Sequence, residues 1–169
     1  MSVRPSRLRI SDWLLGASSL ALIVVLFGLD WYQVKPQFRS SLLVLGERVT
    51  ANGWQVYTWI GPLCVIVAAL GILYAVLQAT RRAPALPVLT VIVLTPFSWL
   101  LSVALVVRVL LARPSLVLPG GQHSALQVCD GAYAGLGLAL IITVCGWLSL
   151  RREGIDPHDS PLLIETLTT

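Results

Sequence analysis

Long runs of apolar residues alternate with short polar and charged stretches along this chain. No charged residue occurs in four segments, which are residues 13–29, 49–80, 83–107 and 131–150. A helix needs about 20 apolar residues to cross the hydrocarbon core of a bilayer. The pattern therefore predicts an integral membrane protein with four transmembrane helices. We expect the spans at about residues 13–32, 55–78, 86–110 and 131–150.

These spans leave no room for a separate soluble domain in a chain of 169 residues. We expect an all-α fold, a four-helix transmembrane bundle over residues 1–152, followed by a polar C-terminal tail over residues 153–169. The connection near Arg81 is very short, which makes the second and third helices antiparallel neighbours. Pro96 interrupts the third run and lacks a backbone N–H, so a kink is expected there.

Basic residues at the ends of the runs indicate the orientation. With the N-terminus inside, seven arginines lie on the inner side and five basic residues on the outer side. The inner set is Arg4, Arg7, Arg9, Arg81, Arg82, Arg151 and Arg152, and the outer set is Lys35, Arg39, Arg48, Arg108 and Arg113. The positive-inside rule then places both termini in the cytoplasm of a multi-pass plasma-membrane protein. The strong preference for Arg over Lys suggests a bacterial source.

The net charge of +4 does not indicate a nucleic-acid partner, because the basic residues sit at helix ends, where they meet lipid headgroups. The expected partner is the lipid bilayer itself. The composition also allows a protein partner, which would be another membrane protein or a second copy of this chain.

Four ionisable residues are expected near the outer face, and they form a candidate polar cluster of Asp30, Arg108, Arg113 and Asp130. Ionisable groups at membrane depth are expensive and often functional. Only Arg108 lies at the hydrocarbon edge, where it can snorkel to water, pair with an aspartate or bind a ligand. Asp12 and Asp30 bound the first run, so we expect no acidic residue inside a span and no proton relay.

Small residues recur every fourth position at the start of the last run, at Gly131, Gly135 and Ala139. Such a face lets a neighbouring helix approach closely. The spacing predicts a helix-packing face and leaves open whether the partner lies in this chain or another.

The longest connection, about residues 30–53, carries apolar residues at helical spacing between Phe38 and Val49. This pattern fits either a short amphipathic helix in the membrane interface or an irregular loop.

Residues with catalytic or ligand-binding chemistry are sparse. Cys64, Cys129 and Cys145 show no C-x-x-C spacing, which argues against membrane thiol oxidases. Buried thiols are the default, and a disulfide between Cys64 and Cys129 stays open. His123 and His158 fall on opposite sides of the membrane, so they cannot share a haem. Without a serine elbow, P-loop, zinc spacing or paired carboxylates, we predict no catalytic, cofactor or metal site.

Short segments of the chain form a familiar arrangement. They are LDWY at 29–32, GWQVY at 53–57, GAYAGL at 131–136 and GWLSLR at 146–151. In layout, over most of its length, the chain resembles small four-helix membrane proteins of actinobacteria. The resemblance implies the four-helix fold and brings no activity with it.

Three functions are compatible with this pattern. The leading hypothesis is a structural or interaction protein, an accessory subunit that binds another membrane protein or a lipid. A small transporter or channel subunit is the alternative indicated by Pro96 with Thr95 and Ser98. A membrane enzyme acting on a lipid or quinone at the outer interface would have to use Asp30, Arg108, His123 and Asp130.

Overall fold

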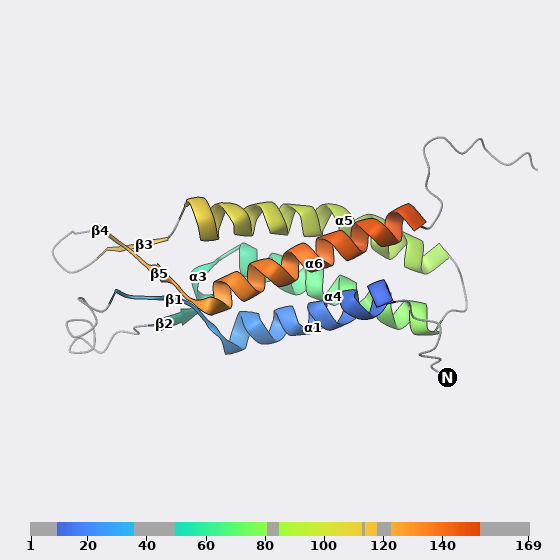
Figure 1. The fold of residues 1–169 in the computed structure, drawn as a ribbon, viewed down its shortest axis with the longest axis horizontal. Coiled ribbons are helices and arrows are strands. Elements are labelled where there is room, and N and C mark those ends of the chain that lie inside the picture. Colours follow the sequence, from blue (N-terminus) through green and yellow to red (C-terminus); the bar gives the residue numbers. More distant parts are fainter. Residues whose placement is uncertain (1–9, 36–49, 81–84, 113, 118–122, 153–169) are drawn as a thin grey trace, which may run out of the picture.

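The computed structural model describes residues 10–35, 50–80, 85–112, 114–117 and 123–152. Within these ranges, four long helices lie side by side (Figure 1). They are α1 (Ile10–Gly28), α4 (Ile60–Thr80), α5 (Ala85–Val106) and α6 (Asp130–Arg152). Each is long and apolar enough to cross a membrane. The predicted helical bundle with four spans is therefore confirmed, and the chain is a multi-pass membrane protein.

The first two spans differ at their ends from the ranges expected. Helix α1 begins at Ile10 rather than Trp13 and ends at Gly28 rather than Tyr32. The second span was expected from residue 55, but a separate short helix, α3 (Gly53–Val56), precedes α4. A capping box starts α3: the Asn52 side chain accepts from the Gln55 N–H at 3.0 Å, and the Gln55 side chain accepts from the Asn52 N–H.

Helix α5 runs through Pro96 and continues into a π-helical turn, η2 (Val107–Leu111). Pro96 lies on the exposed side of the helix. Two hydroxyls beside it bond to carbonyls of the same helix: Thr95 Oγ1 donates to Val91 O at 2.8 Å, and Ser98 Oγ donates to Thr95 O at 2.8 Å. Both hydroxyls are therefore satisfied by the backbone of α5 itself.

Short strands gather at one end of the bundle (Figure 1). A three-stranded antiparallel sheet has the order β2–β1–β5, and β3 pairs with β4. The strands are β1 (Asp30–Gln33), β2 (Thr50–Asn52), β3 (Ser115–Val117), β4 (His123–Ala125) and β5 (Gln127–Val128). The apolar pattern did not predict them, and the amphipathic segment between Phe38 and Val49 lies outside the described residues. We call this end the sheet end; the opposite end, where α1 begins and α6 ends, is the terminal end.

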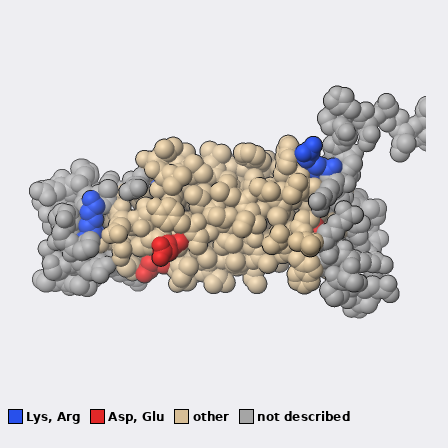
Figure 2. Space-filling model, in the orientation of Figure 1, with Lys and Arg blue, Asp and Glu red and all other residues tan. Residues whose placement is uncertain are grey.

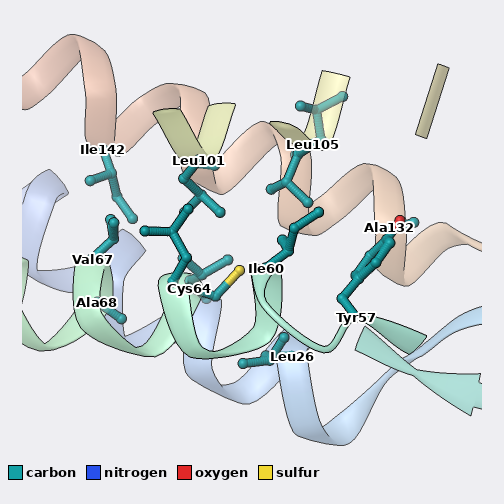
Figure 3. Packing of buried hydrophobic residues seen from close by; sticks show 14 of the residues in the cluster. Leu26, Tyr57, Ile60, Cys64, Val67, Ala68, Leu101, Leu105, Ala132 and Ile142 are labelled. Atoms are coloured by element: carbon teal, nitrogen blue, oxygen red, sulfur yellow. The ribbon is translucent and has the colours of Figure 1, made fainter. Parts of the chain in front are cut away.

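Apolar side chains from all four long helices meet on the bundle axis (Figure 3). Leu22, Val67, Leu101 and Ile142, one from each helix, are fully buried. Helix α1 packs against α4 and α6, and α5 packs against the same two helices. Helices α4 and α5 are antiparallel neighbours, as the short connection predicted.

The surface of the bundle is apolar as well. Large side chains such as Trp99, Leu100 and Val103, in the middle of α5, are about half exposed. Figure 2 shows a broad band without charged atoms, with charged residues of the described chain toward the two ends. A helix that is apolar on every face belongs in a membrane, because lipid solvates the outer side chains.

Candidate functional site

Three aromatic side chains form a buried cluster at the sheet end, which we call the aromatic cluster: Trp31, Tyr32 and Tyr57. Strand β1 supplies Trp31 and Tyr32, and Tyr57 follows α3. The ring of Tyr57 meets Trp31 and Tyr32 edge to face, with centroids 6.0 and 5.9 Å apart. Trp31 Nε1 donates to Val25 O at 2.9 Å, so the buried indole is fixed in place.

Two tyrosine hydroxyls link this cluster to α5. Tyr32 and Tyr57 share a hydrogen bond, and the Tyr32 hydroxyl donates to Arg108 O at 3.4 Å. Each hydroxyl carries one proton, so Tyr57 is the donor to Tyr32. Burial is the main cause that raises the pKa of Tyr57, and the neighbouring Tyr32 adds to it, while the charge of Arg108 acts in the opposite direction. Tyr57 is therefore neutral at physiological pH.

Arg108 occupies the π-helical turn η2, near the end of the third span. The turn closes through Ala112 N–H, which donates to Val107 O at 2.6 Å. The Arg108 side chain is half-buried. Its charge lies close enough to Tyr57 to act on that hydroxyl. A π-helical turn changes the direction in which side chains leave a helix and is frequent at functional sites.

The structure describes three residues of the predicted outer cluster, Asp30, Arg108 and Asp130, and no ion pair joins Arg108 to either aspartate in this part of the chain. Asp30 and Asp130 are both exposed. A β-carbon added to Gly131, the residue that follows Asp130, would lie 2.5 Å from the backbone oxygen of Asp30. The two aspartates are thus neighbours on the surface of the sheet end. The backbone carbonyl of Arg108 accepts a hydrogen bond from the Tyr32 hydroxyl. Arg113 lies outside the described residues.

The small-residue face of α6 packs inside this chain. A β-carbon on Gly131 would lie 3.0 Å from Leu29 Cβ, and one on Gly135 would lie 2.5 Å from Cζ2 of Trp31. Ala139, one turn further along, is buried. The two glycines therefore let the end of α1 and strand β1 approach α6 closely.

A second polar cluster, which the sequence analysis did not predict, occupies the terminal end. Asp12 is only 7% exposed. The Tyr74 hydroxyl donates to Asp12 Oδ1 at 3.4 Å, and Gln78 Nε2 donates to Tyr74 OH at 2.8 Å. The prediction of no acidic residue within a span is wrong, because α1 starts at Ile10 and includes Asp12 in its first turn, and the fourth span begins at Asp130.

One signal in the sequence could have revealed Asp12. The buried positions of α1 recur at intervals of three and four, at Leu15, Ser18, Ser19, Leu22 and Leu26. Asp12 precedes Leu15 by three residues and so belongs to the same stripe, which faces the core.

The cysteines and histidines give no reactive centre in the described chain. All three cysteines are free thiols, so Cys64 and Cys129 form no disulfide. Among the described residues, no group of three or more His, Cys, Asp and Glu side chains lies together to hold a metal ion. His123 lies on β4, and His158 falls outside the described ranges.

No protein-family model, no curated protein and no solved structure matches this chain. The likeness in layout to small four-helix membrane proteins of actinobacteria therefore stays a prediction.

Proposed function

We propose that this protein is an accessory subunit of the membrane that binds another membrane protein or a lipid through its sheet end. The observation that carries the proposal is the environment of Arg108. This cation is half-buried on a π-helical turn at the end of a span, beside the neutral Tyr57. A guanidinium at that depth meets lipid phosphates, or the acidic groups that flank a partner's span, and binds them through two parallel hydrogen bonds.

The proposal includes an orientation and a location. In this orientation the sheet end faces outward and both termini lie in the cytoplasm. The positive-inside rule supports it, because two arginine pairs, Arg81-Arg82 and Arg151-Arg152, stand in the sequence directly at the ends of the second and fourth apolar runs. The membrane is the plasma membrane of a bacterium, on the evidence of the arginine-rich composition.

The hydroxyls in the middle of the bundle favour an interaction protein over a small transporter or channel subunit. Ser102 Oγ and Thr143 Oγ1 share a hydrogen bond of 2.8 Å, and Thr143 Oγ1 also lies 3.0 Å from Ser98 O. These bonds join α5 to α6 and so act as packing contacts between membrane helices. A transport site would instead direct such groups to a passage or a substrate.

The positions at the sheet end likewise favour binding over catalysis. An enzyme acting on a lipid or quinone needs its polar groups to converge on one reacting atom. Within the described chain, no ion pair joins Arg108 to Asp30 or Asp130, and the contact of Arg108 with Tyr32 is made by its backbone carbonyl. A binding role needs only the exposed part of Arg108.

Co-purification with an Arg108 variant tests this function. Wild type and Arg108→Gln are purified from their native membrane in mild detergent, and bound protein and lipid are identified by native mass spectrometry. We expect a partner or lipid on the wild type and about tenfold less on the variant, since a charge-assisted hydrogen bond contributes about 1.5–3 kcal/mol. Arg151→Gln, which removes an exposed arginine at the terminal end, is the matched control and retains wild-type binding. A wild-type protein that carries neither partner nor lipid refutes the proposal, as does equal retention by both variants.

A further inference from the structure

Trp99 lies at a depth where tryptophan is uncommon on the surface of a membrane protein. It occupies the middle of the third span, Val88–Leu111, and its side chain is 53% exposed. In the described chain its indole N–H has no hydrogen-bond partner, and lipid hydrocarbon offers none. The other exposed tryptophans lie at or near the ends of spans, where an indole N–H can reach water or a headgroup. They are Trp13, Trp54, Trp59 and Trp147.

Pro96, one turn before Trp99, leaves a carbonyl without its usual donor. Proline has no N–H, so the carbonyl oxygen of Ile92 lacks the bond that residue 96 of an α-helix would donate. The hydroxyls of Thr95 and Ser98 do not replace it, because they donate to other carbonyls of α5. Ile92 and Pro96 are both exposed, so this carbonyl lies on the outer side of the helix.

A donor and an acceptor thus occur on one side of α5, near the middle of the span. We call this side the α5 face; helices α4 and α6 pack against the opposite side of α5 (Figure 1). Its exposed side chains recur at spacings of three and four, the spacing along which two parallel helices pack. They are Leu89, Ile92, Pro96, Trp99 and Val103.

Two copies of the chain would satisfy both groups at once. Copies inserted in one membrane have the same orientation, so a two-fold axis along the membrane normal brings their α5 faces together with the helices parallel. The Trp99 side chain leans toward the N-terminal end of α5, whereas the Ile92 carbonyl points toward its C-terminal end. The two groups therefore converge on the level of Pro96, and the symmetry gives two equivalent bonds.

Solvation by lipid explains only part of this face. Exposed leucine, isoleucine and valine side chains need no protein partner, because lipid tails are as apolar as they are. An indole N–H and a carbonyl freed by proline differ from them, since hydrocarbon leaves both unsatisfied. A different membrane protein would need an acceptor and a donor of its own at this depth, whereas a second copy brings both.

We propose that the protein forms a symmetric homodimer through the α5 face, in which Trp99 Nε1 of each copy donates to the Ile92 carbonyl of the other. The occupant of the face is a second copy because the face carries both the donor and the matching acceptor. The dimer uses neither Arg108 nor the sheet end, so it does not rest on the proposed function.

Self-association of the purified full-length protein in lipid vesicles tests the dimer. Energy transfer between copies labelled at Lys35, the single lysine, is followed as the protein is diluted with lipid. We expect Trp99→Phe, which keeps an aromatic ring and removes the N–H, to raise the dissociation constant about tenfold, since each dimer loses two bonds between helices. Pro96→Ala is expected to act equally, because the restored N–H binds the Ile92 carbonyl within the helix.

Two matched controls are expected to dimerise as the wild type does. Trp147→Phe makes the same change at an exposed tryptophan near the end of α6, and Pro62→Ala does so at an exposed proline in the first turn of α4. The double variant Trp99→Phe with Pro96→Ala is expected to dimerise as each single variant does, because the second change removes a bond that is already lost.

The single and double variants change only exposed residues, and each is first shown to keep the wild-type helix content. A folded wild type that stays monomeric at every dilution overturns the proposal and leaves the α5 face to lipid or to a different membrane protein. A dimer that both single variants leave unchanged overturns it as well. Additive losses in the double variant also contradict it, because Trp99 and Pro96 would then act through separate contacts.

Discussion

Gly135 lies so close to the indole of Trp31 that an added β-carbon would come within 2.5 Å of Cζ2 and 2.6 Å of Cη2. The ring cannot move away, because it is fully buried and its Nε1 is bonded to Val25 O. We predict that Gly135→Ala lowers the free energy of unfolding by about 1–3 kcal/mol, the usual cost of overpacking a core. Unfolding in detergent micelles with increasing denaturant, followed by tryptophan fluorescence, measures the change.

Gly137 provides the matched control on the same helix. A β-carbon there would meet nothing within 4 Å. Alanine is better than glycine in a helix by up to about 1 kcal/mol, so Gly137→Ala is expected to be neutral or slightly stabilising. If Gly135→Ala and Gly137→Ala unfold at the same denaturant concentration, the prediction is wrong, and the contact with Trp31 does not exclude a larger side chain at position 135.

The sequence predicted some of these residue positions and missed others for definable reasons. The spacing of Gly131, Gly135 and Ala139 indicated a packing face, but it held no information on what covers that face. The covering residue, Trp31, lies on a strand after α1 rather than on a facing helix. Asp12 was missed because the span was assumed to start after the last charge, whereas helical hydrogen bonding extends into the preceding turn.

Helices α5 and α6 are joined in the middle of the bundle by a hydroxyl network centred on Thr143. Thr143 Oγ1 is 2.8 Å from Ser102 Oγ, 3.0 Å from Ser98 O and 2.9 Å from Ala139 O. We predict that Thr143→Val lowers the free energy of unfolding by about 0.5–2 kcal/mol, the range measured for hydrogen bonds between membrane helices. The same denaturant titration reports it.

Thr95→Val is the matched control for Thr143→Val, because it removes a hydroxyl that donates to Val91 O within its own helix rather than between helices. Its effect should be smaller than that of Thr143→Val. A double-mutant cycle with Ser102→Ala separates the bond from other effects of either change. Zero coupling between positions 102 and 143 would mean that this hydrogen bond does not hold the helices together.

At the level of elements, hydropathy predicted the helices and not the strands. The helices are long, so each shows its apolar character over many residues. The strands have two to four residues, too few for an alternating pattern to be visible. Their pairing is also distant in the chain, since Tyr32 is opposite Val128. The short helix α3 could have been predicted, because Asn52 and Gln55 have the spacing of a capping box.

On the scale of the whole molecule, the arrangement of charge constrains how the bundle sits in a membrane. The apolar band in Figure 2 separates the charged residues of the two ends. Four spans return the chain to the side on which it started, so α1 begins and α6 ends at the same face of the membrane. The fold alone allows either face. The positive-inside rule predicts the face that carries both termini to be the cytoplasmic one, because basic residues next to helices are retained on that side.

Labelling of single cysteines from outside the cell distinguishes the two orientations. Two of the native thiols are buried, but Cys129 is half-buried, so all three are first replaced by Ser. Lys35→Cys at the sheet end and Arg151→Cys at the terminal end then each place one exposed thiol at a known end. We predict that a membrane-impermeant maleimide labels position 35 in intact cells and labels position 151 only after permeabilisation. The reverse pattern would put the sheet end, with Arg108, in the cytoplasm, where any partner or lipid of this end would also have to lie.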